Sequence, residues 1–150
     1  MRQIRFTKDG YEKLKKEKED LLLQRPDAVL DLKKAREMGD LSENGYYKSA
    51  RFKLSSIDRR LRIIAATLKQ AVLIDSTKNG VVNIGSLVTL LNDGKETNYT
   101  IVGDFEADPN QKKISLMSPL GKALEGKKIG DTVNIYTPSG KTTYRIINIF

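Results

Sequence analysis

Apolar residues in the first half of the chain recur at alternating spacings of three and four, the pattern of a helix that packs along one seam. There are two such seams, and the second is the clearer because no polar residue interrupts it. Its members are Tyr47, Ala50, Leu54, Ile57, Leu61, Ile64, Leu68 and Ala71. An earlier seam, from Tyr11 to Ala35, is interrupted only by Lys18 and Arg25. The two seams predict an antiparallel coiled-coil hairpin with arms on the order of 45 Å long, at 1.5 Å per residue.

Local signals predict how the first helix begins and continues. Thr7 is a favourable N-cap, and Phe6 and Tyr11 are spaced to form a hydrophobic staple across it. Pro26 lies in the middle of the seam, where it lacks a backbone donor and collides with the preceding turn. We therefore expect a bend at Pro26 but no division into separate domains.

The turn between the helices, near residues 39–44, has two interpretations. Gly39 offers the left-handed conformation that ends a helix, and residues 40–44 supply cap-forming side chains. Asp40 and Glu43 have the spacing of a capping box for the second helix, and spacing alone favours this structural role. An apex with two carboxylates also provides oxygen ligands of the kind that Mg²⁺ prefers, although no nearby acidic cluster completes a self-contained site.

After residue 71 the periodicity changes to that of short strands. The predicted strands are residues 72–74, 86–91, 97–102, 113–117, 132–136 and 142–149, and Asn92-Asp93-Gly94 predicts a hairpin between two of them. Ser118 as cap and Pro119 at the first helical position predict a short helix. The fold class is therefore α+β, with a coiled-coil hairpin domain at 1–75, a linker near 75–80 and an antiparallel sheet domain at 76–150.

The amino-acid composition excludes several kinds of catalytic and metal site and indicates the charge of the partner. The chain has no Cys and no His, which excludes disulfides, thiolate or imidazole metal sites and His-based catalytic triads. It lacks a signal-peptide pattern and any apolar run of membrane-spanning length, so we expect a soluble, cytoplasmic protein. The net charge of +8 favours polyanionic partners. Residues 42–71 carry +5 and residues 8–38 only +1, so the second helix is the basic one.

Residues 35–44 (Ala-Arg-Glu-Met-Gly-Asp-Leu-Ser-Glu-Asn), followed by Tyr47 and Ala50-Arg51, resemble the tip signature of the bacterial transcript-cleavage elongation factors, the GreA/GreB family. The resemblance is closer to GreA and includes Arg25-Pro26 and residues 103–109 and 118–131. It implies a C-terminal domain similar in fold to FKBP-type prolyl isomerases. In that family this domain docks on RNA polymerase, and the coiled coil enters the secondary channel of a backtracked complex.

The resemblance also implies roles for individual residues. Asp40 and Glu43 would help to hold a Mg²⁺ ion shared with RNA polymerase and to position the water that cleaves the nascent RNA. Arg36 and Arg51 match the family's basic patch for the RNA 3′ end, and Lys48 is added because it lies near the apex. The chain is thus expected to be a monomer, to bind no cofactor alone, and to activate the polymerase's endonucleolytic activity without being an enzyme itself.

The tip also departs from the family pattern, and this leaves alternatives open. Tyr46 and Phe52-Lys53 stand where acidic or polar residues are usual, so the tip is more basic and more aromatic than expected. Some relatives occupy the secondary channel and inhibit the polymerase, so a non-cleaving regulator is one alternative. An FKBP-like chaperone is another, but isomerase pockets of that fold usually contain Trp and this chain has none.

Overall fold

The computed structural model describes residues 2–39, 44–75 and 79–150. The chain forms two compact units, one containing Glu12–Gln70 and the other containing Met1–Tyr11 together with Ala71–Phe150. Relative to the predicted ranges 1–75 and 76–150, residues 1–11 and 71–75 group with the sheet. Each unit has its own buried residues and is described separately.

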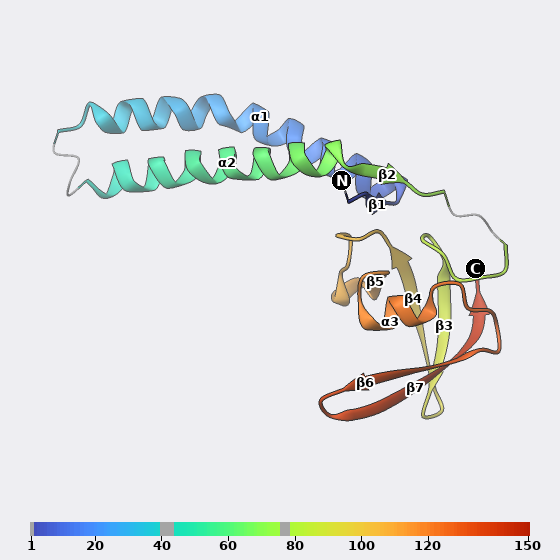
Figure 1. Ribbon diagram of the computed structural model, residues 1–150. Coiled ribbons are helices and arrows are strands. Elements are labelled where there is room, and N and C mark those ends of the chain that lie inside the picture. The colour runs from blue at the N-terminus through green and yellow to red at the C-terminus, as the bar shows by residue number, and fades with distance from the viewer. Residues whose placement is uncertain (1, 40–43, 76–78) are drawn as a thin grey trace. The chain divides into compact units, whose positions relative to one another are not determined.

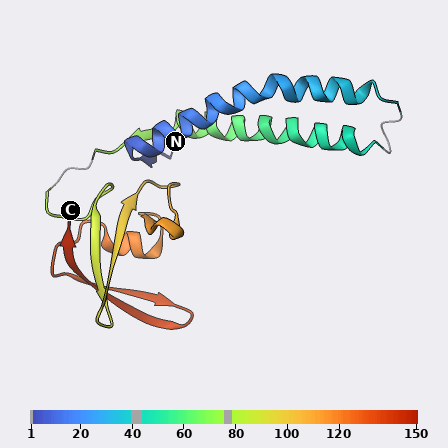
Figure 2. The same ribbon diagram turned by 180° about the vertical axis from the view of Figure 1, so that it is seen from behind.

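The first unit is a helical hairpin of α1 (Lys8–Arg36) and α2 (Gly45–Lys69), which lie side by side in both views (Figures 1 and 2). The residues buried along it are Ala28, Leu32, Ala35, Ala50, Ile57 and Ile64. Every position of the predicted second seam is buried or half-buried. The prediction of an antiparallel helical hairpin is therefore confirmed.

The start of α1 is capped as its sequence predicts. Thr7 Oγ1 accepts a hydrogen bond from the backbone N–H of Gly10 at 3.0 Å. The rings of Phe6 and Tyr11 meet edge to face, with centroids 6.4 Å apart. The helix continues through Pro26 without a break, so the prediction that proline does not divide it is confirmed.

Two ion pairs join the helices beside the apolar seam. Arg25, one of the polar interruptions of the first seam, contacts Asp58 through Nε and Oδ1 at 2.6 Å. Arg60 contacts Glu17 through both arms of its guanidinium group, with Nη2 and Oε2 2.7 Å apart. The hydrogen bond from Arg25 lowers the pKa of Asp58, and the hydrogen bond from Arg60 lowers the pKa of Glu17.

These two pKa shifts predict that acid weakens the hairpin. A carboxyl whose folded-state pKa is lowered stabilises the fold above its unfolded-state pKa, which is about 4, and this stabilisation is lost as the pH falls through the lower folded-state value. We expect the melting midpoint of the helical circular-dichroism signal to fall as the pH drops below about 4. The double variant Glu17→Gln, Asp58→Asn should flatten this dependence, and an unchanged pH profile would contradict the assignment.

The second unit contains a curled sheet with the strand order β5-β4-β3-β7-β6 (Figure 1). Its strands are β3 (Leu87–Asn92), β4 (Lys95–Val102), β5 (Lys113–Ser115), β6 (Thr132–Thr137) and β7 (Gly140–Ile149). Asp93 and Gly94 connect β3 and β4 with φ angles of 48° and 74°, as in the predicted hairpin. The pairing is antiparallel as predicted, except that β5 runs parallel to β4.

A short helix, α3 (Pro119–Leu124), lies against one face of this sheet (Figures 1 and 2). Ser118 caps it by accepting a hydrogen bond from Gly121 N at 3.0 Å, which confirms the predicted start. Leu124 is completely buried in a cluster with strand residues such as Leu90 and Ile146. A single turn of 3₁₀ helix, η1 (Pro109–Gln111), precedes β5.

The sequence analysis did not predict the strand β1 (Ile4–Phe6), which pairs in parallel with β2 (Ala71–Leu73). Arg5 N donates to the carboxylate of Asp104 at 2.7 Å, and Asp104 N donates back to the carbonyl of Arg5 at 2.9 Å. The guanidinium group of Arg5 forms an ion pair with the same carboxylate at 3.0 Å. These contacts explain why the N-terminal residues group with the sheet.

None of the helices within residues 2–39, 44–75 and 79–150 combines the length and the apolar character that a membrane span requires.

Candidate functional site at the hairpin tip

Asn44 organises the start of α2. Its backbone is extended, with φ −81° and ψ 100°, and its Oδ1 accepts a hydrogen bond from Tyr47 N at 3.1 Å. Its Nδ2 donates to the carbonyl of Ala35 in the last turn of α1 at 3.3 Å. One side chain therefore caps the second helix and links it to the end of the first. Across the turn, Gly39 has the predicted left-handed conformation, with φ 105°.

The capping-box interpretation of the tip is wrong for α2. A capping box formed by Asp40 and Glu43 requires the helix to begin directly after Asp40. The helix instead begins at Gly45, and Asn44 is its N-cap. Asp40 and Glu43 themselves lie outside the described residues. The start of α2 therefore does not require either carboxylate.

A small buried cluster lies between the end of α1 and the start of α2. It contains Leu32, Ala35 and Ala50, with Tyr47 and Leu54 packed against it. Alanine at two of these positions lets the helices approach closely, and the partly buried Tyr47 ring packs against them. Tyr47 therefore serves packing, as its place at the start of the seam predicts.

Each basic residue of the predicted patch directly follows a residue of this cluster. Arg36 follows Ala35, Lys48 follows Tyr47, and Arg51 follows Ala50. All three basic side chains are exposed, and none forms an ion pair with another described residue. The ends of both helices therefore contribute positive charge beside the apex.

The sequence analysis overlooked two further basic residues near the tip. Lys33 and Lys34 lie in the last turn of α1 with Arg36, and both are exposed. Positive charge in a last helical turn interacts favourably with the helix dipole, so these side chains have a structural role whether or not they bind a ligand. The run Lys33-Lys34-Ala35-Arg36 was the signal that could have identified them.

The chemistry of the available donors fits a hard divalent cation. The chain has neither His nor Cys, so its side-chain metal ligands are oxygen atoms. Mg²⁺ is usually bound through one or two protein carboxylates together with water and substrate phosphate. Within the described part of the chain, no group of three or more acidic residues could hold a metal ion. Asp40 and Glu43 lie outside that part, and two carboxylates would leave the remaining coordination positions of such an ion to other ligands.

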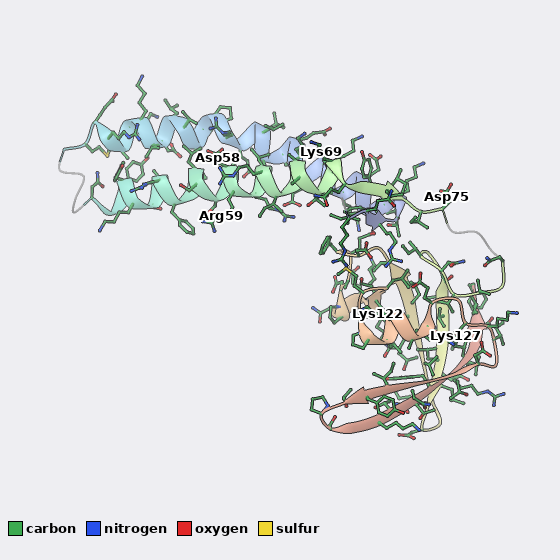
Figure 3. All side chains as sticks on the ribbon, viewed as in Figure 1. Asp58, Arg59, Lys69, Asp75, Lys122 and Lys127 are labelled. Atoms are coloured by element: carbon green, nitrogen blue, oxygen red, sulfur yellow. The ribbon has the colours of Figure 1, made fainter. Side chains whose placement is uncertain are left out.

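The outer face of α2 has a different character from the face that contacts α1. Asp58 lies toward α1, where it pairs with Arg25, whereas Arg59 lies on the side directed away from α1 (Figure 3). Arg59 is exposed and has no ion-pair partner among the described residues. Its positive charge is therefore available to a ligand.

Two family models match almost the whole chain. The model described as "Transcription elongation factor, N-terminal" matches residues 4–73. The model described as "Transcription elongation factor, GreA/GreB, C-term" matches residues 77–150.

Individual proteins match over the same length. Transcription elongation factor GreA of Paracoccus denitrificans (strain Pd 1222) is 40% identical over 153 residues, covering 99% of this chain and 98% of the relative. The protein of the same name from Yersinia pestis is 42% identical over 155 residues, with coverage of 99% and 98%. The crystal structure of GreA factor homolog 1 (Gfh1) of Thermus thermophilus aligns with a TM-score of 0.48 and 29% identity, covering 99% of each chain.

Proposed function

Because the chain belongs to the GreA/GreB family of transcription elongation factors, we propose that it enters the secondary channel of RNA polymerase and stimulates the polymerase's own cleavage of backtracked nascent RNA. The observation that carries this proposal is similarity to proteins named GreA over 99% of the chain. The retained Asp40 and Glu43 favour cleavage over simple occupation of the channel. The chain then acts as an activator, and the catalytic centre belongs to the polymerase.

Asp40 and Glu43 are the residues of this chain that would hold Mg²⁺ jointly with the polymerase. When bound, the metal stabilises negative charge on the attacking and leaving oxygens of phosphodiester hydrolysis. The two carboxylates would bind the ion from the side of this chain and would accept a hydrogen bond from the attacking water. The assignment is consistent with the start of α2, where Asn44 provides the N-cap.

The helical hairpin gives these carboxylates reach and rigidity. The 25 residues of α2 correspond to about 37 Å at 1.5 Å per residue. The buried seam and the Arg25–Asp58 and Arg60–Glu17 pairs restrain the two helices against each other. A stiff support lowers the entropic cost of positioning catalytic groups.

Arg36, Lys48 and Arg51 would bind phosphates of the displaced RNA 3′ segment. Exposed positive side chains supply affinity for a nucleic-acid backbone without reading its sequence. Their place beside the tip brings RNA affinity to the same end of the hairpin as the carboxylates.

The proposal is tested with purified, backtracked elongation complexes that carry end-labelled RNA. The wild-type chain should shorten the RNA in a Mg²⁺-dependent reaction, well above the rate of polymerase alone. A non-cleaving regulator would leave the RNA length unchanged while competing with a cleavage factor for the polymerase. An FKBP-like chaperone would instead accelerate isomerisation of an X-Pro peptide without polymerase. Either result would overturn the proposal.

The basic patch predicts an effect on affinity. Arg51→Ala should raise the factor concentration for half-maximal cleavage by about fivefold, the loss expected for one contact worth roughly 1 kcal/mol. The rate at saturating factor should change little, since the carboxylates are untouched. Lys69→Gln, at the opposite end of α2 (Figure 3), is the matched control and should behave as wild type. Equal effects of the two changes would contradict a local RNA contact.

A further inference from the structure

Phe52 is a large aromatic side chain that is mostly exposed to solvent. It lies in the second turn of α2 and is 71% exposed. It belongs to neither buried cluster of the described residues. Phenylalanine has no polar atom that could form a hydrogen bond with water. Because the ring also packs in no buried cluster, nothing in the described fold explains an aromatic residue at this position.

The neighbours of Phe52 on the helix surface are basic or small. Residues three and four positions apart share a helix face, so Phe52 is flanked by Lys48 on one side and by Ser55 and Ser56 on the other. Arg59, two turns further along, is on the same outer side and is exposed. Small serine side chains leave the ring accessible, and the cations create a positive surface around it.

An exposed leucine on α1 provides the contrast. Leu23 is 77% exposed, about as open as Phe52, but its helix neighbours are Glu19, Asp20 and Asp27. An acidic surface repels a nucleic-acid backbone. Leu23 and Phe52 are the two most exposed large apolar side chains of the described helices α1 and α2, and they lie in opposite electrostatic surroundings.

The positive charge around Phe52 is not neutralised within the described hairpin. The segment Gly45–Lys69 contains seven basic residues and one acidic residue, Asp58, whose carboxylate is paired with Arg25 of α1. Of the seven, only Arg60 forms an ion pair with another described residue. The outer surface near Phe52 is thus complementary to a polyanion.

We propose that Phe52 stacks on an unpaired base of the displaced nascent RNA while Lys48 and Arg59 contact the adjoining phosphates. Proteins bind single strands by combining a basic surface with aromatic side chains that stack on bases, and each stacked base is worth a few- to a hundredfold in affinity. Phe52 is seven residues after Gly45, so it lies about 10 Å along the helix from the start of α2. The inference rests on the proposed function, because it places displaced RNA beside the hairpin tip.

The first test measures binding of a fluorescently labelled oligoadenylate to the full-length protein by anisotropy at low salt. Phe52→Leu keeps an apolar side chain but removes the aromatic face, and it should weaken binding about fivefold. Phe52→Tyr should bind within about twofold of wild type because it keeps the ring. Leu23→Ala is the matched control and should have no effect. Wild-type affinity of Phe52→Leu would overturn the proposal.

The salt dependence separates stacking from charge. Phe52→Leu should leave the slope of log affinity against log salt unchanged, since stacking releases no counterions. Lys48→Ala should reduce that slope by about 0.7, the value for one phosphate contact on a single strand. A reduced slope in Phe52→Leu would mean that the substitution disturbs the basic surface, which would overturn the stacking assignment.

The second test uses a backtracked elongation complex with 5-iodouridine in the displaced RNA. Irradiation should cross-link the RNA to the peptide containing Phe52, and the cross-link should persist in Phe52→Tyr and disappear in Phe52→Leu. If Phe52→Leu weakens polymerase binding but leaves RNA binding and cross-linking intact, the ring contacts protein and the proposal is overturned. If the cross-link depends on Phe52 but the RNA is not shortened, the proposed cleavage function is overturned and the stacking proposal stands.

Discussion

Replacing Asp40 by asparagine should lower the rate of factor-stimulated RNA cleavage by about 100-fold or more. Asparagine keeps the size of the side chain but removes the negative charge, and its amide oxygen is a weaker ligand for Mg²⁺. If the carboxylate acts on charge that develops only in the transition state, its loss lowers the maximal rate and leaves binding intact. A factor of 100 corresponds to about 2.7 kcal/mol, within the range supplied by a metal ion in hydrolysis.

The measurement is the single-turnover rate of RNA shortening at saturating factor, together with the affinity for polymerase in a competition assay. Glu43→Gln should behave like Asp40→Asn. Glu37→Gln is the matched control, because Glu37 is an exposed carboxylate in the turn after α1 and has no ion-pair partner among the described residues. Higher Mg²⁺ concentration should restore part of the rate of Asp40→Asn. An unchanged rate in Asp40→Asn would contradict the assignment.

The hairpin could be predicted because its signals are long and mutually consistent. The seam from Tyr47 to Ala71 repeats over the full length of α2, so an error at any single position would not have changed the result. Thr7 and Gly39 were also identified correctly, since a cap and a left-handed glycine depend on local backbone geometry.

The residue that caps α2 could not be chosen from the sequence. Asp40, Ser42 and Asn44 all have side chains suited to an N-cap, and such residues differ by only a fraction of a kcal/mol. Asn44 also donates to the carbonyl of Ala35 on the other helix, a contact that depends on the packing of the hairpin. A tertiary hydrogen bond of this kind leaves no periodic signal. The functional interpretation of Asp40 and Glu43 likewise came from family resemblance, because their spacing favoured a cap.

The first strand was missed for a related reason. The strand β1 has three residues, too few to show alternation, and its position depends on Arg5 and Asp104, which are distant in sequence. Local sequence patterns also cannot predict that β5 pairs in parallel with β4, although both strands were predicted. Glycine at position 103 has a physical reason here, since a Cβ would lie 2.4 Å from the carbonyl oxygen of Arg5.

The close approach of α3 to the sheet predicts a large loss of stability for Gly121→Ala. A Cβ at Gly121 would lie 2.0 Å from the carbonyl oxygen of Ser115 and 2.9 Å from the Cα of Leu116. Both are backbone atoms, so no side-chain rotation relieves the overlap. Helix α3 would have to move outward, which would draw the buried Leu124 from the core. We expect the sheet unit to lose about 3 kcal/mol or more, at the upper end for overpacking a core.

Gly45→Ala is the matched control for this change. Gly45 is the first residue of α2, and nothing lies within 4 Å of a Cβ built there. Alanine lowers the entropy of the unfolded chain and favours helix, so this variant should be neutral or more stable by up to about 1 kcal/mol. In a Tyr46→Phe, Tyr47→Phe background, which removes the tyrosines of α2, guanidinium unfolding followed by tyrosine fluorescence reports the sheet unit, which contains Tyr99 and Tyr144. Helical circular dichroism reports the hairpin. A free energy of unfolding of Gly121→Ala within about 1 kcal/mol of wild type would contradict this prediction. It would mean that α3 accommodates a methyl group at position 121 and that close packing is not the reason for glycine there.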